Sequence, residues 1–280
     1  MVTVLTNNEK YIINMAMRRL AEGAYLCAVE CCNRILEIDS TLFDAHFIKG
    51  CALYNLEQYD LSEAEFLRAL KNMPLTKSCY SNLAMAAVKC GDSSVIRVIE
   101  SAARTVLPNA DLFMMCGILY ADIEDYEKSF ECFNIAHELK PAMASIYINA
   151  GSVMLERRDA QEKDFIHAIC CFTKALTLSP LNKYAYYNRC KAYLKLKDGE
   201  KALNDADTLL FIERNNAGFY YIYGNALMLL ERYDEAKSYY ETAHSFGIEY
   251  ISTESRKRLA EIKELCKKRM NKGHFCKSAP

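Results

Sequence analysis

The chain has 280 residues and a formal net charge of −1, with 51% hydrophobic and 25% charged residues. This much apolar material excludes an intrinsically disordered chain, and the near-zero charge excludes a general attraction to nucleic acid or to an anionic membrane. Only ten Gly and five Pro interrupt stretches rich in Ala, Leu, Glu, Lys and Met, which predicts an all-helical protein.

Thirteen cysteines are scattered along apolar stretches and form no regular framework. Free cysteine at such positions acts as a small hydrophobic residue, which is typical of a reducing compartment. Residues 1–19 lack the apolar core and cleavage site of a secretory signal, and no apolar run reaches the ~18 residues of a membrane span. We therefore expect a protein of the cytoplasm or nucleus that does not insert into membranes.

After a lead-in over residues 1–8, a pattern of two predicted helices recurs along the chain. In its first half a glycine follows an aromatic residue or His by four positions. In its second half a small residue precedes a phenylalanine by four positions, and a proline closes the copy. The first-half pairs are His46 and Gly50, Phe113 and Gly117, Tyr147 and Gly151, and Tyr220 and Gly224. The second-half sets are Ser62, Phe66 and Pro74; Ser129, Phe133 and Pro141; and Ala168, Phe172 and Pro180.

Residues 9–249 divide into about seven such repeats. These are 9–42, 43–76, 77–109, 110–143, 144–182, 183–216 and 217–249. The fifth repeat is longer by about five residues, which fall around Arg158 to Lys163, and we expect a surface loop or an extra helical turn there. Apolar residues at helical spacing predict a capping helix over 250–271, and a flexible tail is expected over 272–280.

The recurring positions resemble the tetratricopeptide repeat, whose pattern is W-x2-L-G-x2-Y, then A-x3-F, then P, with a period of ~34 residues. The resemblance covers residues 9–249. It implies an all-α, right-handed α-solenoid of stacked antiparallel helix pairs, in which neighbouring repeats complete one another's core. We expect small residues such as Gly50 to let the two helices of a repeat approach closely, and bulky residues such as Phe66 to fill the space between repeats.

In this family the first helices of successive repeats line a concave face, so the resemblance implies a peptide-binding groove there. Methionine and aromatic side chains in a groove suit an amphipathic helix or an extended apolar peptide. The alternative is that many of these residues belong to the core. The predicted groove residues are Phe47, Tyr54, Asn82, Met85, Met114, Ile118, Ile148, Asn149, Tyr184, Tyr187, Asn188, Lys191, Tyr221 and Asn225.

A row of asparagines recurs at the sixth position of several repeats, including Asn82, Asn149 and Asn188. Their amides are able to pair with the backbone of a bound peptide, or they are present only because asparagine is common at this position in the family.

The family also contains a clamp of Lys and Asn side chains that holds the C-terminal carboxylates of heat-shock chaperones. Asn188 matches its middle repeat. However, four positions expected to be basic in the flanking repeats carry Gly218, Ile222, Ile148 and Ser152. Because an unpaired carboxylate is costly to desolvate, we do not expect this chain to bind chaperone tails in that way.

The face of the predicted capping helix is rich in Lys and Arg, and we expect it to be solvated, with an acidic partner or a nuclear signal as the minority alternative.

No arrangement of His with Cys or carboxylates has a catalytic spacing, and no glycine-rich phosphate loop is present. Cys27 and Cys31 share a helix face, as do His167 and Cys171, but neither pair has the second pair of ligands that zinc needs. Near the C-terminus, His274 and Cys276 lie in the tail beside Cys266. The thiol of the tail cysteine would be reactive only if it were exposed. We therefore predict no enzyme activity, no cofactor and no metal.

The leading hypothesis is a non-catalytic scaffold or adaptor for the assembly of a protein complex, with a peptide or helix of a partner protein in its groove and no nucleic-acid partner. The alternative is a co-chaperone or regulatory subunit that shields apolar client segments, and the third hypothesis is an enzyme. Family analogy adds cytoskeletal, ciliary and nuclear assemblies to the expected cytoplasmic location.

Overall fold

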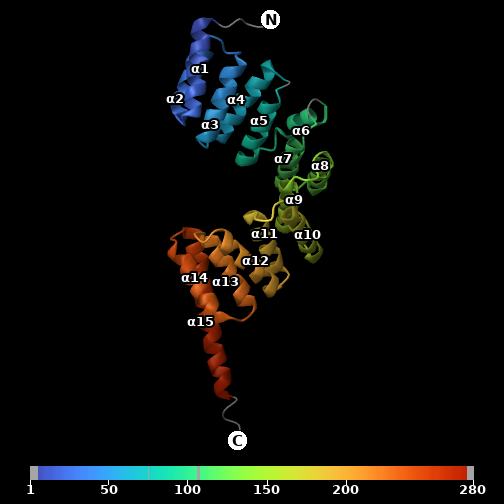
Figure 1. Ribbon diagram of the computed structural model, residues 1–280, viewed down its shortest axis with the longest axis vertical. Helices are drawn as coiled ribbons and strands as arrows, with labels where there is room; N and C mark the ends of the chain where they lie inside the picture. Colours follow the sequence, from blue (N-terminus) through green and yellow to red (C-terminus); the bar gives the residue numbers. More distant parts are fainter. Residues whose placement is uncertain (1–5, 75, 106–107, 276–280) are drawn as a thin grey trace. The chain divides into compact units, whose positions relative to one another are not determined.

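The computed structural model describes residues 6–74, 76–105 and 108–275, and for residues 266–275 the backbone alone. The described residues form fifteen α-helices and no β-strand, which confirms the all-helical prediction (Figure 1). The helices are α1 (Asn7–Ala21), α2 (Tyr25–Leu36), α3 (Phe43–Asn55), α4 (Tyr59–Asn72), α5 (Lys77–Cys90), α6 (Ile96–Thr105), α7 (Ala110–Asp122), α8 (Tyr126–Leu139), α9 (Ala144–Glu156), α10 (Glu162–Leu178), α11 (Lys183–Lys195), α12 (Gly199–Ile212), α13 (Ala217–Leu229), α14 (Tyr233–Ser245) and α15 (Glu249–Phe275).

Two helices lie in each predicted repeat, and from the second repeat onward the first helix begins on the first predicted residue. The final helix differs from its prediction. It begins one residue before the predicted capping helix and continues through Phe275, four residues into the segment predicted as a tail. Residues 276–280 of that segment lie outside the described residues.

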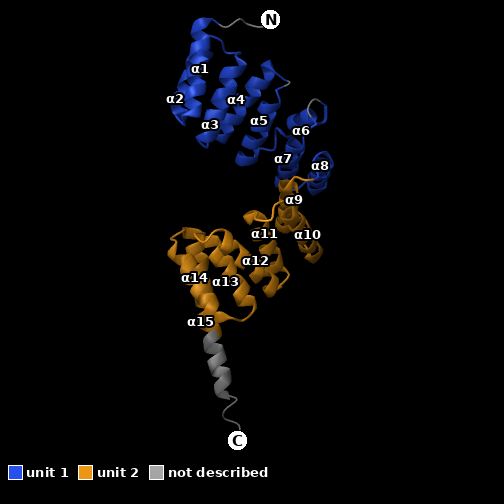
Figure 2. Ribbon diagram, viewed as in Figure 1, with its two compact units in different colours: residues 1–141 blue, residues 142–280 orange. Residues whose placement is uncertain are grey.

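The chain forms two compact units, residues 1–141 and 142–280 (Figure 2). In the N-terminal unit, α1 to α8 form four helix pairs, and the second helix of one pair packs against the first helix of the next. The first helices α1, α3, α5 and α7 also contact their neighbours in turn. In the C-terminal unit the same arrangement runs from α9 to α15, and α15 contacts both α14 and α13. Within each unit, therefore, the first helices lie side by side and form one face.

The two helices of a repeat approach closely because a glycine of the first helix faces an aromatic ring of the second. A Cβ atom added at these glycines would lie 2.7 to 2.9 Å from the ring, closer than atoms pack. The ring of Phe66 therefore packs against the first helix of its own repeat. The pairs are Gly50 and Phe66, Gly117 and Phe133, Gly151 and Phe172, and Gly224 and Tyr240.

The preceding small residue of the second helix adds a hydrogen bond to this contact. Ser62 Oγ donates to the carbonyl of Gly50 (2.8 Å), and Ser129 Oγ donates to the carbonyl of Gly117 (2.7 Å). Both hydroxyls are buried and satisfied, so the serine in the repeat pattern has a structural role.

The turn between the helices of most repeats places one residue in the left-handed region, with φ between 58° and 76°. The next amide then donates to a carbonyl five residues earlier, as Asp198 N does to Tyr193 O (2.9 Å), which is the usual way to close a helix. The residues in this conformation are Gly23, Glu57, Gly91, Glu124, Lys197 and Glu231. Four of the six carry a side chain at a position that favours glycine.

Replacing Lys197 with glycine is expected to stabilise the C-terminal unit by about 0.5–1 kcal/mol, because a left-handed conformation costs a side-chain-bearing residue about 1–2 kcal/mol. Thermal unfolding measures the change. The matched substitution Gly91→Ala at the equivalent turn should destabilise the protein. A stability loss in Lys197→Gly would show that the side chain compensates for its backbone conformation.

The fifth repeat lacks the left-handed turn because of its insertion. Residues 157–161 form a longer loop, in which the guanidinium of Arg157 donates two hydrogen bonds to Asp159 (2.6 and 2.7 Å). Helix α10 then begins where the backbone N–H of Gln161 donates to Asp164 Oδ2 (2.8 Å), and at 17 residues it is three residues longer than α12, which has 14. The insertion therefore contributes both to a loop and to an extended helix.

No helix among the described residues combines the length and the hydropathy that a bilayer crossing requires.

Candidate functional site

The predicted groove residues lie on the first helices of both units, and each unit is considered by itself. The N-terminal unit carries Phe47, Tyr54, Asn82, Met85, Met114 and Ile118 on α3, α5 and α7. The C-terminal unit carries Ile148, Asn149, Tyr184, Tyr187, Asn188, Lys191, Tyr221 and Asn225 on α9, α11 and α13. All are half-buried or exposed except Met114, which is only 9% exposed. Met114 is therefore a core residue, a correction to its predicted place in the groove.

Tyrosines gather on α11, α13 and the start of α15 in the C-terminal unit. Tyr184 is 64% exposed, and Tyr250, which is absent from the predicted set, is 75% exposed. Tyr187 lies 6.0 Å from the ring of Phe219, and Tyr221 lies 5.7 Å from the ring of Tyr240, so both rings are anchored in the core. We call Tyr184, Tyr187, Tyr221 and Tyr250 the tyrosine surface.

Burial raises the pKa of Tyr187, and the neighbouring Tyr221 and Tyr250 add to the rise, while the charge of Lys191 opposes it. The Lys191 ammonium lies 5.9 Å from the centre of the Tyr187 ring. The hydroxyl of Tyr187 therefore stays protonated at neutral pH, and it is available as a hydrogen-bond donor.

The asparagine row has a structural role at two positions. Asn188 Nδ2 donates to Ser152 Oγ on α9 (2.9 Å), and Asn82 Nδ2 donates to Cys51 Sγ on α3 (3.4 Å). Each amide thus joins neighbouring first helices, which leaves its oxygen and its second N–H for a ligand. Ser152 and the buried Ile222 occupy positions where the chaperone clamp needs cations.

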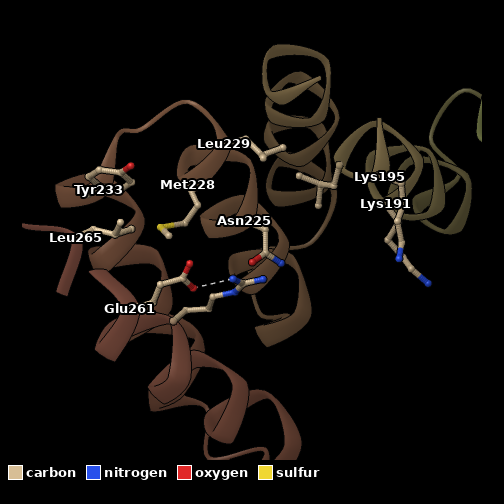
Figure 3. A pocket seen from close by; sticks show the side chains of 10 residues that line it. Lys191, Lys195, Asn225, Met228, Leu229, Tyr233, Glu261 and Leu265 are labelled. Carbon is tan, nitrogen blue, oxygen red and sulfur yellow. Dashed lines mark hydrogen bonds and ion pairs between the residues drawn. The ribbon is translucent and has the colours of Figure 1, made fainter. Parts of the chain in front are cut away.

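A pocket of 420 Å³ opens beside the tyrosine surface, between α11, α13, the start of α14, and α15 (Figure 3). Figure 3 shows Asn225 on α13 and Glu261 on α15 at the pocket, with a dashed line for the ion pair between Glu261 and Arg258. The pocket is lined by Lys191, Leu194, Lys195, Asn225, Met228, Leu229, Tyr233, Arg258, Glu261 and Leu265. Of these, Lys191 and Asn225 belong to the predicted groove.

Helix α15 completes the pocket with Arg258, Glu261 and Leu265, none of which is in the predicted set. Their spacing of three and four residues places them on one helix face, and this is the signal from which they were predictable. The helix is therefore more than a cap over the core, because one of its faces continues the surface formed by α11 and α13.

Cations outnumber carboxylates in the pocket lining. Lys191 Nζ lies 2.8 Å from Glu156, and Arg258 Nη1 lies 2.8 Å from Glu261. No ion pair of Lys195 occurs among the described residues. Burial lowers the pKa of Arg258, but hydrogen bonds to Glu261 and Tyr221 outweigh it and raise the pKa above its usual value, so the guanidinium keeps its charge.

The N-terminal unit contains a His–carboxylate contact that the sequence spacing did not reveal. His46 Nδ1 lies 2.6 Å from Glu65 Oε2, while Lys49 Nζ and Arg68 Nη1 lie 2.9 and 2.7 Å from Glu65 Oε1. The other ring nitrogen, His46 Nε2, donates to the carbonyl of Ser40 (2.9 Å). Both ring nitrogens of His46 and both carboxylate oxygens of Glu65 have a partner within the protein, which fits a structural network.

The cysteines behave as core side chains where burial is high. Burial raises the pKa of Cys32 and Cys79 to about 12 and that of Cys51 to about 11, so these thiols are protonated at neutral pH. Within the described part of the chain, no group of three or more His, Cys, Asp or Glu residues is placed to hold a metal ion. The side chains of Cys266, His274 and Cys276 lie outside the described residues.

These features define a class of protein: an α-solenoid of helix pairs whose C-terminal unit presents a surface rich in tyrosine. A family model described as the tetratricopeptide repeat matches residues 43–72 and 217–244, which cover α3 with α4 and α13 with α14. Two of the helix pairs therefore match the tetratricopeptide repeat, the family that the repeat pattern of the whole sequence resembles.

Two known proteins match part or most of the chain at low identity. The chain is 22% identical over 289 aligned positions to the BBSome complex member BBS4 of Bos taurus, which covers 88% of this chain and 55% of that protein. It is 25% identical over 113 positions to anaphase-promoting complex subunit 3 of Schizosaccharomyces pombe, covering 40% of this chain and 17% of the relative. The chain thus spans about half the length of the first relative and less of the second.

Among solved structures, a tetratricopeptide repeat protein from Parabacteroides merdae superposes with a TM-score of 0.70 at 13% identity. The match covers 92% of this chain and all of that one. At this identity the similarity concerns the fold alone.

Proposed function

We propose that this protein is a non-catalytic scaffold that binds a peptide or helix of a partner protein along the first helices of its C-terminal unit. The observation that carries the proposal is the tyrosine surface with the pocket beside it. Large exposed rings such as Tyr184 and Tyr250 are costly to leave in water, and they are the residue type that dominates protein-binding surfaces.

The chemistry of the surface suits a peptide better than a small reactive substrate. Tyrosine supplies a large contact area with little rotamer entropy to lose, and Met228 adapts to side chains of different shape. The free oxygen of the Asn188 amide is available to a peptide N–H. The names of two relatives describe members of multi-subunit complexes, which supports a role in complex assembly for this chain as well.

Affinity purification with the variant Tyr184→Ala, Tyr250→Ala tests this proposal. Because both side chains are exposed, the variant keeps its core, and we expect recovery of specific partners to fall about tenfold or more, the effect of losing interface hot spots. The matched control is Phe211→Ala on α12, whose ring is 78% exposed and lies off the tyrosine surface. Unchanged recovery with the tyrosine variant, or an equal loss with Phe211→Ala, would contradict the proposal.

The same experiment separates the scaffold from the alternative of a co-chaperone or regulatory subunit that shields apolar segments. A scaffold should recover a small fixed set of proteins, whereas a shielding role should recover many unfolded proteins weakly. We extend the proposal to a cytoplasmic location, with ciliary assembly as the finer alternative suggested by the BBSome relative.

A further inference from the structure

We propose that the pocket between α11, α13 and α15 takes an acidic, amphipathic segment of the partner, in which carboxylates flank an aliphatic side chain. This inference rests on the proposed function and names the chemistry of the partner at the same site. It follows from the shape of the pocket, from its apolar floor and from the balance of charges at its rim.

The floor of the pocket is apolar and comes from three helices. Leu194 of α11, Met228 and Leu229 of α13, and Leu265 of α15 contribute aliphatic surface, with Tyr233 at one side. Leu229 is among the exposed large hydrophobic residues of the protein. A volume of 420 Å³ falls within the range of about 300–1,000 Å³ typical of ligand sites, so the floor has room for an aliphatic side chain of a partner.

The charged residues of the lining select an acidic partner. Three of them are cations, Lys191, Lys195 and Arg258, and one is a carboxylate, Glu261. Two of the cations already hold a carboxylate of this chain, so Lys195 is the cation with no ion pair among the described residues. A carboxylate of the partner would pair with it at the pocket rim, whereas a lysine or arginine of the partner would be repelled.

Arg258 is held in place before any partner arrives. Its hydrogen bonds to Glu261 and Tyr221 restrict the guanidinium, so that pairing with a second carboxylate costs little further ordering. An acidic residue of the partner therefore meets cations on both the α11 side and the α15 side of the apolar floor.

The test is a selection from a display library of short random peptides on the immobilised full-length protein. We expect the selected peptides to carry Asp or Glu on both sides of Leu, Ile or Met. Their affinity, measured by fluorescence anisotropy, should fall about tenfold in Lys195→Glu and less than twofold in Lys237→Glu, a matched reversal on α14 away from the pocket. Raising the salt concentration should weaken binding to the wild type more than to Lys195→Glu.

The possible failures are distinguishable. Selected peptides that are neutral or basic, or acidic peptides that bind Lys195→Glu as tightly as wild type, overturn the acidic partner and leave the scaffold proposal standing. If no peptide is selected and partner recovery also ignores the tyrosine surface, the scaffold proposal fails as well. Single-stranded RNA that binds the pocket more tightly than the selected peptides, with the same loss in Lys195→Glu, would assign the positive rim to phosphates instead.

Discussion

Gly50→Ala is expected to destabilise the N-terminal unit by about 2 kcal/mol, although alanine is the better helix former by ~1 kcal/mol. The added Cβ would lie 2.7, 2.9 and 3.0 Å from three ring atoms of Phe66. Phe66 is fully buried, so its ring has no space to move into, and the overpacking cost of up to ~3 kcal/mol exceeds the gain in helix propensity.

Urea unfolding followed by circular dichroism measures this loss, and a double-mutant cycle isolates its cause. In the background of Phe66→Leu the ring is absent, so Gly50→Ala should there be neutral or stabilising, which gives a coupling energy of about 2 kcal/mol. Gly218→Ala is the matched control, because its Cβ would meet only Asn216 Oδ1 at 3.3 Å and Ile251 Cδ1 at 3.9 Å. Equal losses in the two backgrounds would show that the glycine is needed for another reason.

The recurrence of this contact explains why so much of the fold was predictable. A glycine and an aromatic ring that touch in four of the seven repeats leave a fixed period in the sequence, and that period places Gly117 against Phe133 as it places Gly50 against Phe66. The positions of the predicted groove residues on the first helices follow from the same period. Once the repeat is aligned, helix geometry decides that Tyr184, Tyr187 and Lys191 share a face.

Features that do not recur were not predictable in this way. Glu57, Glu124, Lys197 and Glu231 adopt a left-handed conformation because the turn geometry demands it, while their residue types suggest an ordinary helix. Helix α15 contributes Arg258 and Leu265 to the pocket. Their spacing places them on one helix face, but the sequence of α15 does not match the repeat, so the repeat pattern does not indicate which helices that face contacts. Met114 is buried although its position in the repeat matches the other predicted groove residues, because packing against neighbouring helices decides burial.

The network around Glu65 is the clearest case of a contact hidden from the sequence, because His46 lies 19 positions away. We expect Glu65→Ala to destabilise the N-terminal unit by about 3 kcal/mol, the typical cost of removing one partner from a buried ionic group. Glu65 is 3% exposed, and its loss leaves the buried His46 without its partner. Arg68 and Lys49 reach water more easily, so His46 carries most of the cost.

The effect of Glu65 should depend on pH in a defined direction. Burial alone would raise the pKa of this carboxyl, but the hydrogen bonds from His46 and Lys49 and the charges of Lys49 and Arg68 lower it to about 2. In the unfolded chain a glutamate has a pKa of about 4.3. The unfolded state therefore binds the proton first as the pH falls, and the stability that Glu65 contributes is complete above about pH 4.5 and lost as the pH approaches 2.

Urea unfolding of wild type and Glu65→Ala at several pH values tests this directly. The difference in unfolding free energy should be largest near neutral pH and should shrink steadily between pH 4.5 and pH 2. Glu131→Ala is the matched control, because Glu131 binds Arg104 at 2.8 Å but is 55% exposed, and its removal should cost less than about 0.5 kcal/mol at any pH. A difference that does not change with pH would mean that Glu65 stabilises the helix pair through packing, and its ionisation would then have no part in holding α3 against α4.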